Sequence, residues 1–321
     1  MERPLVELRN LKTYFYVEQE VSKAVNDISF TVKAGETVCI VGESGCGKSV
    51  TALSLMRLVS DPGKIVGGEI YFAGNDLLKF KEAEMRRLRG ADIAMIFQEP
   101  MTALNSVFTI GQQMVEPLME HRFLSKKEAY RKASELIQTV GIPRAEEICL
   151  AYPHELSGGM LQRIMIATAL SCEPKLLIAD EPTTALDVTI QAQILDLLRQ
   201  MKSEFNMSIL FITHDLGVVA EMADRVIVMY AGKIIEEAPV LELFSHPKHP
   251  YTQGLLKSKP IIGRHEKRLY SIPGQVPNLV ELKESCYFSD RCQHCLEFCK
   301  TKAPELVAGP GEHKTACYLY A

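Results

Sequence analysis

Short apolar runs recur along the chain and alternate with segments in which apolar residues follow a helical spacing. The runs do not alternate with polar residues, which is typical of parallel strands buried on both faces. They lie at 37–42, 91–97, 174–180, 208–214 and 223–230. The clearest helical spacing is at 189–204. Strands that alternate with helices predict an α/β core built on a parallel sheet.

Two parts of the chain depart from this pattern. Between about 100 and 172 the spacing is helical only, and one helix there is marked by a capping box of Ser125 with Glu128 and a stop at Gly141. We predict an inserted helical subdomain. After residue 240, Pro and His become frequent, which indicates a boundary. The predicted domains are 1–240 and a small C-terminal region, 241–321.

Composition narrows the class of protein. Of the 321 residues, 47% are hydrophobic and 24% charged, as in ordinary globular proteins, and a net charge of −4 offers no general surface for nucleic acid. No apolar run approaches the roughly 20 residues that cross a bilayer, and residues 1–10 lack the apolar segment of a signal peptide. We therefore expect a cytoplasmic protein with reduced thiols. Four of the nine cysteines lie within 286–299, a density that in this setting indicates metal binding more often than disulfides.

The string "GESGCGKS" at 42–49 follows a predicted strand and precedes a predicted helix, as a phosphate-binding loop does. Its glycines let backbone N–H groups converge on phosphate oxygens at a helix N-terminus. Lys48 would reach the β- and γ-phosphates and Ser49 would bind Mg²⁺, so ATP and Mg²⁺ are the predicted cofactors. Cys46 lies next to Lys48 and a helix start, so its pKa should be lowered; the hypothesis is that alkylation inactivates the protein unless MgATP protects it. The alternative, which the residue type favours, is a structural thiol without a role in the chemistry.

The buried run at 174–180 ends in two carboxylates, Asp180 and Glu181. Asp180 could hold Mg²⁺, and Glu181 could orient and deprotonate an attacking water. A second loop, "ELSGGMLQR", places Ser157 and two glycines before another helix and so makes a second phosphate-sized nest. One chain does not need two such nests for one γ-phosphate, whereas a site shared between two chains does.

These motifs together resemble the ATP-binding subunits of ABC transporters over about residues 5–240. "LSGGM" resembles the signature motif, Gln98 in "IFQEP" the Q-loop, "ALD" at 185–187 the D-loop, and His214 in "FITHD" the switch histidine. The implied fold is an α/β P-loop ATPase core with a parallel sheet, an antiparallel β edge, an inserted helical subdomain and a small Cys-rich C-terminal region.

The resemblance implies a role for each matched residue. ATP would lie between the loop of one subunit and Ser157, Gly158 and Gly159 of its partner, with Asp187 at the dimer interface. His214 would contact the γ-phosphate, and Gln98 would join the Mg²⁺ site, with Ser49 and Asp180, to the groove for a membrane subunit. Of Tyr14, Phe15 and Tyr16, the strand register favours Phe15 as the residue that stacks on adenine. The remaining nucleotide-binding residues are Gly42, Ser44, Gly45, Cys46, Gly47, Lys48, Ser49 and Val50.

The C-terminal segment resembles one branch of this family, the dipeptide and oligopeptide importers. "SIPGQVPNL", "FSDRC" and "APEL" carry the resemblance, together with the core phrases "HELSGGMLQRIMIATAL" and "VNDISF". It implies four recurring cysteines, Cys286, Cys292, Cys299 and Cys317, which in some members hold a [4Fe–4S] cluster. Cys295 departs from that pattern and completes a C-x2-C-x3-C run at 292–299 that could bind a metal by itself, so a set of ligands that includes Cys295 is an alternative. Zinc, with His294 and His313 nearby, and metal-free thiols or a disulfide are the alternatives, because thiolates suit iron and zinc alike.

The predicted function is that of the ATP-hydrolysing subunit of a peptide importer, peripheral on the cytoplasmic face of the membrane. Its implied partners are two transmembrane permease subunits, a second ATP-binding subunit (itself or a paralogue) and an extracytoplasmic peptide-binding protein, with no nucleic acid. Soluble ABC proteins that act on DNA or the ribosome usually have two cassettes or a long coiled coil, and a P-loop kinase has no need of "LSGGM". An inactive scaffold is disfavoured because Lys48, Asp180, Glu181 and His214 are all present.

Overall fold

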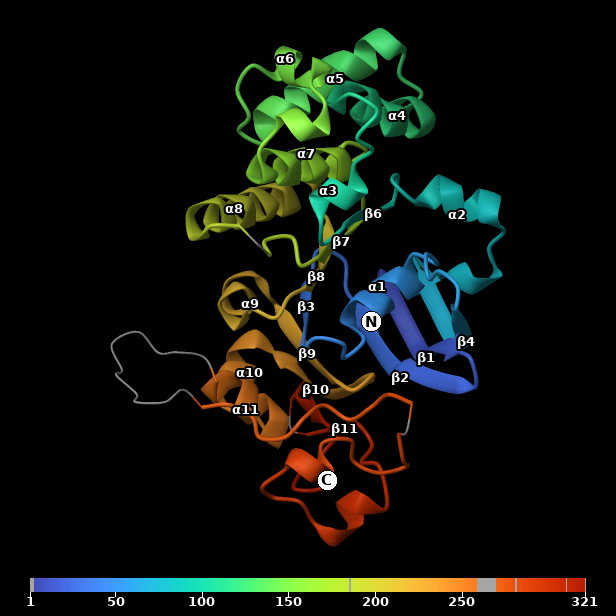
Figure 1. Cartoon of the computed structure of the whole chain (residues 1–321), viewed down its shortest axis with the longest axis vertical. Helices are drawn as coiled ribbons and strands as arrows, with labels where there is room; N and C mark the ends of the chain where they lie inside the picture. Colours follow the sequence, from blue (N-terminus) through green and yellow to red (C-terminus); the bar gives the residue numbers. More distant parts are fainter. Residues whose placement is uncertain (1–2, 185, 259–269, 281, 310, 321) are drawn as a thin grey trace. The chain divides into compact units, whose positions relative to one another are not determined.

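The computed structural model describes residues 3–184, 186–258, 270–280, 282–309 and 311–320. The chain forms two compact units (Figure 1). Unit 1 comprises Met1–Val32, Thr37–Leu78 and Ile212–Ala321, and unit 2 comprises Lys33–Glu36 and Lys79–Phe211.

An antiparallel sheet forms the N-terminal part of unit 1. Its strand order is β2-β1-β4-β5, with β1 at Val6–Val17, β2 at Glu20–Val32, β4 at Gly63–Phe72 and β5 at Asn75–Asp76. Along β1, buried residues such as Val6 and Leu8 alternate with more exposed ones, so one face of the strand packs inward. The predicted antiparallel β edge is confirmed.

The remaining strands of unit 1 run in the order β11-β12-β10-β9-β3. Their bounds are Thr37–Val41 (β3), Arg225–Tyr230 (β9), Lys233–Pro239 (β10), Val307–Ala308 (β11) and Lys314–Thr315 (β12). Strands β3 and β9 pair in parallel and every residue in them is buried, as the unbroken apolar runs predicted. The helices of unit 1 are α1 (Lys48–Leu55), α9 (Leu216–Met222), α10 (Val240–Ser245) and α11 (Pro250–Lys257), with a 3₁₀ turn at Leu77–Lys79 on the unit boundary.

Unit 2 contains the strands β6 (Ile93–Ile96), β7 (Leu176–Asp180) and β8 (Ser208–Ile212), whose last residue already belongs to unit 1. Its helices are α2 (Glu82–Leu88), α3 (Pro100–Ala103), α4 (Ile110–Arg122), α5 (Lys126–Thr139), α6 (Ala145–Leu150), α7 (Gly158–Leu170) and α8 (Val188–Phe205), with a 3₁₀ turn at Pro153–Glu155. The helix predicted at 189–204 is α8. From α3 to α7 the elements are helical only.

The predicted capping box and helix stop are both present at α5. Ser125 Oγ accepts a hydrogen bond from the Glu128 N–H, and the Glu128 carboxylate accepts one from the Ser125 N–H. Gly141 follows the helix with a φ of 76°, in the left-handed region that glycine enters without a Cβ clash. Local sequence therefore determines where this helix begins and ends.

The part of unit 1 that follows residue 269 has, among its described residues, no regular structure beyond β11, β12 and the 3₁₀ turns Ser289–Arg291 and Glu297–Lys300. Polar contacts attach it to the core. His313 is fully buried, with Nε2 2.7 Å from a Glu236 carboxylate oxygen and Nδ1 3.0 Å from Glu242. The neighbouring strand β12 pairs with β10, so the segment between Cys299 and Cys317 becomes part of the sheet.

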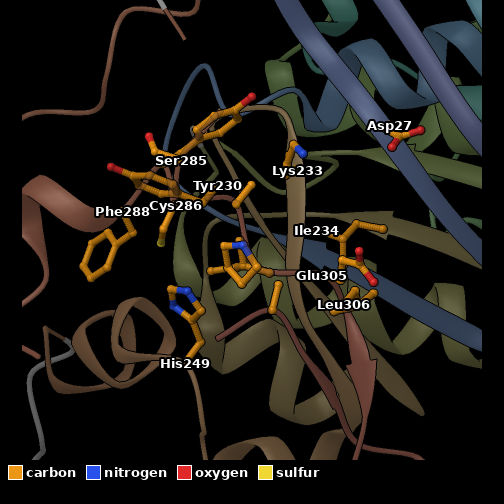
Figure 2. Close-up of a pocket in the computed structure, with 15 residues that line it drawn as sticks. Asp27, Tyr230, Lys233, Ile234, His249, Ser285, Cys286, Phe288, Glu305 and Leu306 are labelled. Carbon is orange, nitrogen blue, oxygen red and sulfur yellow. The ribbon is translucent and has the colours of Figure 1, made fainter. Parts of the chain in front are cut away.

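A cavity of about 230 Å³ lies between β10 and this C-terminal region (Figure 2). Figure 2 shows Cys286, Phe288 and His249 gathered on one side of the cavity and Ile234, Glu305 and Leu306 on the other. The cysteine-bearing segment therefore lies directly beside the β9–β10 hairpin of unit 1.

Candidate nucleotide site and cysteine group

The predicted phosphate-binding loop connects β3 to α1 and has a backbone that requires glycine at two positions. Gly47 has a φ of 102°, and a Cβ there would lie 2.2 Å from the Ala24 carbonyl oxygen. A Cβ on Gly42 would lie 2.3 Å from the Met229 carbonyl oxygen. Any side chain at either position would clash with backbone, so the loop can take this path only with glycine.

Lys48 is the first residue of α1 and its side chain curls back into the loop. Its ammonium donates hydrogen bonds to the carbonyl oxygens of Gly42 (2.9 Å) and Glu43 (3.1 Å), and the residue is buried. Ser44 and Gly45 are exposed at the tip of the loop, and Ser49 and Val50 are half-buried in the first turn of α1. A cation, a helix N-terminus and a glycine-rich backbone thus meet at one place, which suits a phosphate group.

The expectation that Cys46 has a lowered pKa is wrong. Its side chain is buried, and this loss of hydration raises the pKa of the thiol, an effect larger than the opposing attraction of the Lys48 charge. Proximity of the two residues was correctly expected, since Lys48 Nζ lies 3.9 Å from Cys46 Sγ. Burial decides the sign because a thiolate without hydration is costly.

At neutral pH we therefore expect iodoacetamide to modify Cys46 much more slowly than Cys295, by about tenfold or more. Both thiols have raised pKa values, but Cys295 is the more accessible and Cys46 is 1% exposed. Mass spectrometry of peptides after timed alkylation measures the two rates, and Cys46→Ser provides the peptide control. Equal rates would show that the loop opens readily without nucleotide.

His214 lies at the same cavity as the phosphate-binding loop. The Thr213 N–H donates to the Ile40 carbonyl in β3 (3.2 Å), so the next residue emerges at the end of the sheet where the loop begins. A cavity of about 340 Å³ is lined by Gly42, Glu43 and His214, among other residues. The fold of unit 1 thus brings together two motifs that are far apart in the sequence.

In unit 2, Gln98 and Glu181 are brought together by the parallel pairing of β6 and β7. The Gln98 amide donates to a Glu181 carboxylate oxygen (3.1 Å), and the Thr184 hydroxyl donates to the same oxygen (2.9 Å). Glu181 has a φ of 47°, an uncommon backbone conformation that clusters at functional sites. Asp180, the last residue of β7, is buried.

The signature and D-loop residues lie at two helix starts of unit 2. Ser157 caps α7, with Oγ accepting from the Met160 N–H (3.4 Å), and Asp187 caps α8, with a carboxylate oxygen accepting from the Ile190 N–H (3.0 Å). A Cβ on Gly158 would meet no atom within 4 Å, and Gly159 approaches Ile190 at the start of α8. Ala185, part of the predicted D-loop, lies outside the described residues.

Phe15 is half-buried on β1, where its ring packs against Gly63. Tyr14 donates its hydroxyl to Asn26, and Tyr16 is exposed. Phe15 thus combines an apolar contact with remaining accessibility. Its role with adenine stays a prediction.

The cysteine group, defined as Cys286, Cys292, Cys299 and Cys317, lines a single small cavity in unit 1 together with His249, His294 and Phe288. Burial raises the pKa of the Cys286 thiol to about 11, and its neighbours Cys299, Cys317 and Cys292 add to the rise. Cys295 does not line this cavity, and its thiol lies 3.5 Å from the Leu296 carbonyl oxygen. Within the described residues, no three Cys, His, Asp or Glu side chains converge closely enough to hold a metal ion.

Comparison with known proteins identifies the family. The ABC transporter family pattern matches residues 25–184, and that of the oligopeptide/dipeptide transporter C-terminal region matches 235–299. The chain is 53% identical to the oligopeptide transport ATP-binding protein AppD of Bacillus subtilis, covering 98% of this chain and 97% of that one. It belongs to the ATP-binding subunits of ABC transporters, in the peptide-import branch. A second relative, the oligopeptide transport ATP-binding protein OppD of Salmonella typhimurium, is 48% identical over 98% of this chain and 93% of its own.

A solved structure supports the fold of this ABC ATPase. The dimeric structure of MJ0796, a bacterial ABC transporter cassette, superimposes with a TM-score of 0.66 at 28% identity and covers 73% of this chain and 98% of that one. The predictions of the cassette fold and of an ATPase subunit of an ABC importer are therefore confirmed. None of the helices in the described part of the chain is long and apolar enough to span a membrane.

Sequence reasoning missed the residues of the C-terminal half that reach the phosphate-binding loop. The Tyr251 hydroxyl accepts a hydrogen bond from the Glu43 N–H (2.8 Å), and Arg291 forms an ion pair with the Glu43 carboxylate (2.7 Å). One signal was available: Glu43 is a carboxylate inside a loop predicted to bind anionic phosphate, which favours a compensating cation nearby. Which cation supplies the charge could not be read from the sequence.

Proposed function

We propose that this ABC ATPase powers the import of di- and oligopeptides. The observation that carries the proposal is the match to named peptide transport proteins over nearly the whole chain, C-terminal region included. Its partners in the proposal are two transmembrane permease subunits, an extracytoplasmic peptide-binding protein and a second ATP-binding subunit, either a paralogue or a second copy. The protein would lie on the cytoplasmic face of the membrane, with 1–240 as its nucleotide-binding domain.

In the proposed site, ATP binds the loop at 42–49 of one subunit and the Ser157–Gly159 nest of its partner, with Asp187 at the interface. Lys48 exchanges its two loop carbonyls for phosphate oxygens, and Phe15 stacks on adenine. Ser49, Gln98 and Asp180 would hold Mg²⁺, which neutralises charge on the phosphates. The exposed, capped start of α7 supports a role for Ser157 between chains, because its amide-lined end is accessible.

Hydrolysis would use the carboxylate of Glu181 as the general base. A water molecule attacks the γ-phosphorus, its proton passes to Glu181, and the bond from phosphorus to the β–γ bridging oxygen breaks to release ADP and phosphate. Gln98 and Thr184 each donate a hydrogen bond to one oxygen of the Glu181 carboxylate, which supports its role by holding the side chain in a fixed orientation. His214 would contact the γ-phosphate and stabilise the charge that develops there.

We further propose that the cysteine group binds a [4Fe–4S] cluster. The shared cavity supports this choice of four cysteines, and the position of Cys295 outside it supports leaving that residue out. Zinc is less favoured. A single zinc ion needs all its ligand sulfurs within about 2.3 Å of one centre, and no three potential ligands in the described part of the chain converge in that way. A cluster instead distributes its ligand sulfurs over several irons. Metal binding would release thiol protons and supply folding energy to a region with little apolar core.

Reconstitution tests the proposed function. We expect the ATPase rate in proteoliposomes to rise severalfold when the permease subunits, the peptide-binding protein and an oligopeptide are all present. The Lys48→Ala variant in the same assembly controls for contaminating ATPases and should show no peptide-stimulated activity. A parent assembly that binds ATP but gives the same rate with and without di- and oligopeptides would contradict the proposal.

A further inference from the structure

Arg291, which directly precedes a cysteine of the group, contacts the phosphate-binding loop. Its guanidinium forms a two-pronged ion pair with Glu43, at 2.7 Å from one carboxylate oxygen and 3.0 Å from the other. The Arg291 side chain is 5% exposed. A partly buried, bidentate pair of this kind has better geometry than an ordinary surface salt bridge.

Several contacts fix Arg291 in place. Its Nε donates to the Pro273 carbonyl (2.9 Å), and one terminal nitrogen donates to the Tyr230 hydroxyl (3.2 Å). The guanidinium carbon lies 5.7 Å from the ring centre of Tyr230 and 5.8 Å from that of Phe288. The cation is therefore held by the C-terminal region and by β9, and its position does not depend on Glu43 alone.

Glu43 is held through its other polar groups as well. Its N–H donates to the Tyr251 hydroxyl, and its carbonyl oxygen accepts from the Lys48 ammonium (3.1 Å). The path of the loop at Glu43 therefore depends on residues from α11 and from the turn between Cys286 and Cys292. Loss of the ion pair would remove the side-chain contact that joins this loop to the cysteine-bearing turn.

Besides fixing the path of the loop, the ion pair between Arg291 and Glu43 removes a negative charge from it. A carboxylate in a phosphate-binding loop repels the anionic triphosphate, and it repels it most strongly when unpaired in a partly buried site. Arg291 cancels this charge. Both terminal nitrogens of Arg291 donate to the Glu43 carboxylate. This geometry suits a cation that neutralises Glu43 better than one that serves only to attract ATP.

We propose that Arg291 is a positioning residue for ATP binding: by pairing with Glu43 it orients the phosphate-binding loop and neutralises the one carboxylate in it. The inference rests on the proposed role of residues 42–49. It makes the C-terminal region part of the nucleotide-binding machinery of its own subunit, through a residue that lies between two cysteines of the group.

Affinity for a fluorescent ATP analogue in the presence of Mg²⁺ tests the proposal on the full chain. We expect Arg291→Gln to raise the Kd about tenfold and the KM for ATP in parallel, with kcat at saturating ATP within about twofold of the parent. The double variant Arg291→Gln with Glu43→Gln should recover to within about threefold of the parent Kd, because the unpaired charge is gone. Arg291→Lys, which keeps the charge but not the two-pronged geometry, should fall between the parent and Arg291→Gln.

Arg225→Gln is the matched control. Arg225 is equally buried, at 5% exposed, and pairs with Glu237, but it lies beside Val38 at the end of β3 away from the loop. We expect it to lower the melting temperature and leave the Kd unchanged. If Arg291→Gln does not fold, Glu43→Asp replaces it, since the shorter carboxylate keeps the charge and breaks the pairing; its Kd should then exceed that of Glu43→Gln.

Two outcomes would overturn the proposal. One is an Arg291→Gln Kd within twofold of the parent; the other is a raised Kd that Glu43→Gln does not rescue, which would indicate general distortion. Lys48→Ala distinguishes this failure from failure of the loop assignment. If Lys48→Ala loses nucleotide binding while Arg291→Gln does not, only the role of Arg291 is wrong, whereas unchanged binding in both would remove the loop assignment itself.

Discussion

Replacing Glu181 with Gln is expected to reduce steady-state ATP hydrolysis about 100-fold or more while ATP binding persists. An amide keeps the oxygen that accepts hydrogen bonds from Gln98 and Thr184, at 3.1 and 2.9 Å in the parent, so the side chain can stay in place. It cannot take a proton from water, and general-base catalysis contributes roughly 10²- to 10⁴-fold to such reactions. Phosphate release and binding of a fluorescent ATP analogue measure the two properties separately.

The same variant should accumulate as an ATP-bound dimer, because hydrolysis is the step that would separate the subunits. Light scattering after gel filtration in MgATP measures the mass. Glu135→Gln, an exposed carboxylate on α5 that pairs with Arg131, is the control for the loss of one negative charge and should behave as the parent. Hydrolysis by Glu181→Gln at the parental rate would remove Glu181 as the base.

Replacing a cysteine of the group is expected to remove the metal. Protein purified without oxygen should contain about four irons and four sulfides per chain and absorb broadly in the visible range. Cys299→Ser should lower the iron content below about one per chain and lower the melting temperature, because the C-terminal region loses the folding energy that metal binding supplies. Cys295→Ser is the matched control and should retain the iron, since Cys295 lies outside the cavity that the other four line.

Elemental analysis decides between the alternatives. Zinc in place of iron, lost in Cys299→Ser, would assign the group to a zinc site and contradict the cluster. Protein without metal, with an unchanged melting temperature in Cys299→Ser, would show that this region folds on its thiols alone. Because Cys286 has a pKa raised to about 11, its thiol is protonated at neutral pH without metal, and metal uptake should strengthen as the pH rises.

The conformational features of the fold that depend on near neighbours were predictable. The buried strands β3, β7, β8 and β9 show as unbroken apolar runs, and helix α5 carries its start and stop in Ser125, Glu128 and Gly141. The phosphate-binding loop is similarly local, since only glycine permits the φ of 102° at Gly47 and the close approach of the Ala24 carbonyl. Order and spacing of the motifs sufficed to identify the ABC family.

The sequence by itself therefore determined the cassette fold, its motifs and the family. Each motif, and each pattern that predicts a helix or strand, depends on residues only a few positions apart. Tertiary structure decided three further points. The pKa of Cys46 is raised rather than lowered, because burial of its side chain in the folded chain outweighs the charge of the nearby Lys48. The C-terminal fold separates Cys295 from the cavity of the other four cysteines. Finally, Glu43 pairs with Arg291, which lies 248 positions away in the sequence. All three points depend on which remote segments the folded chain brings into contact, because these contacts decide both desolvation and long-range ion pairs.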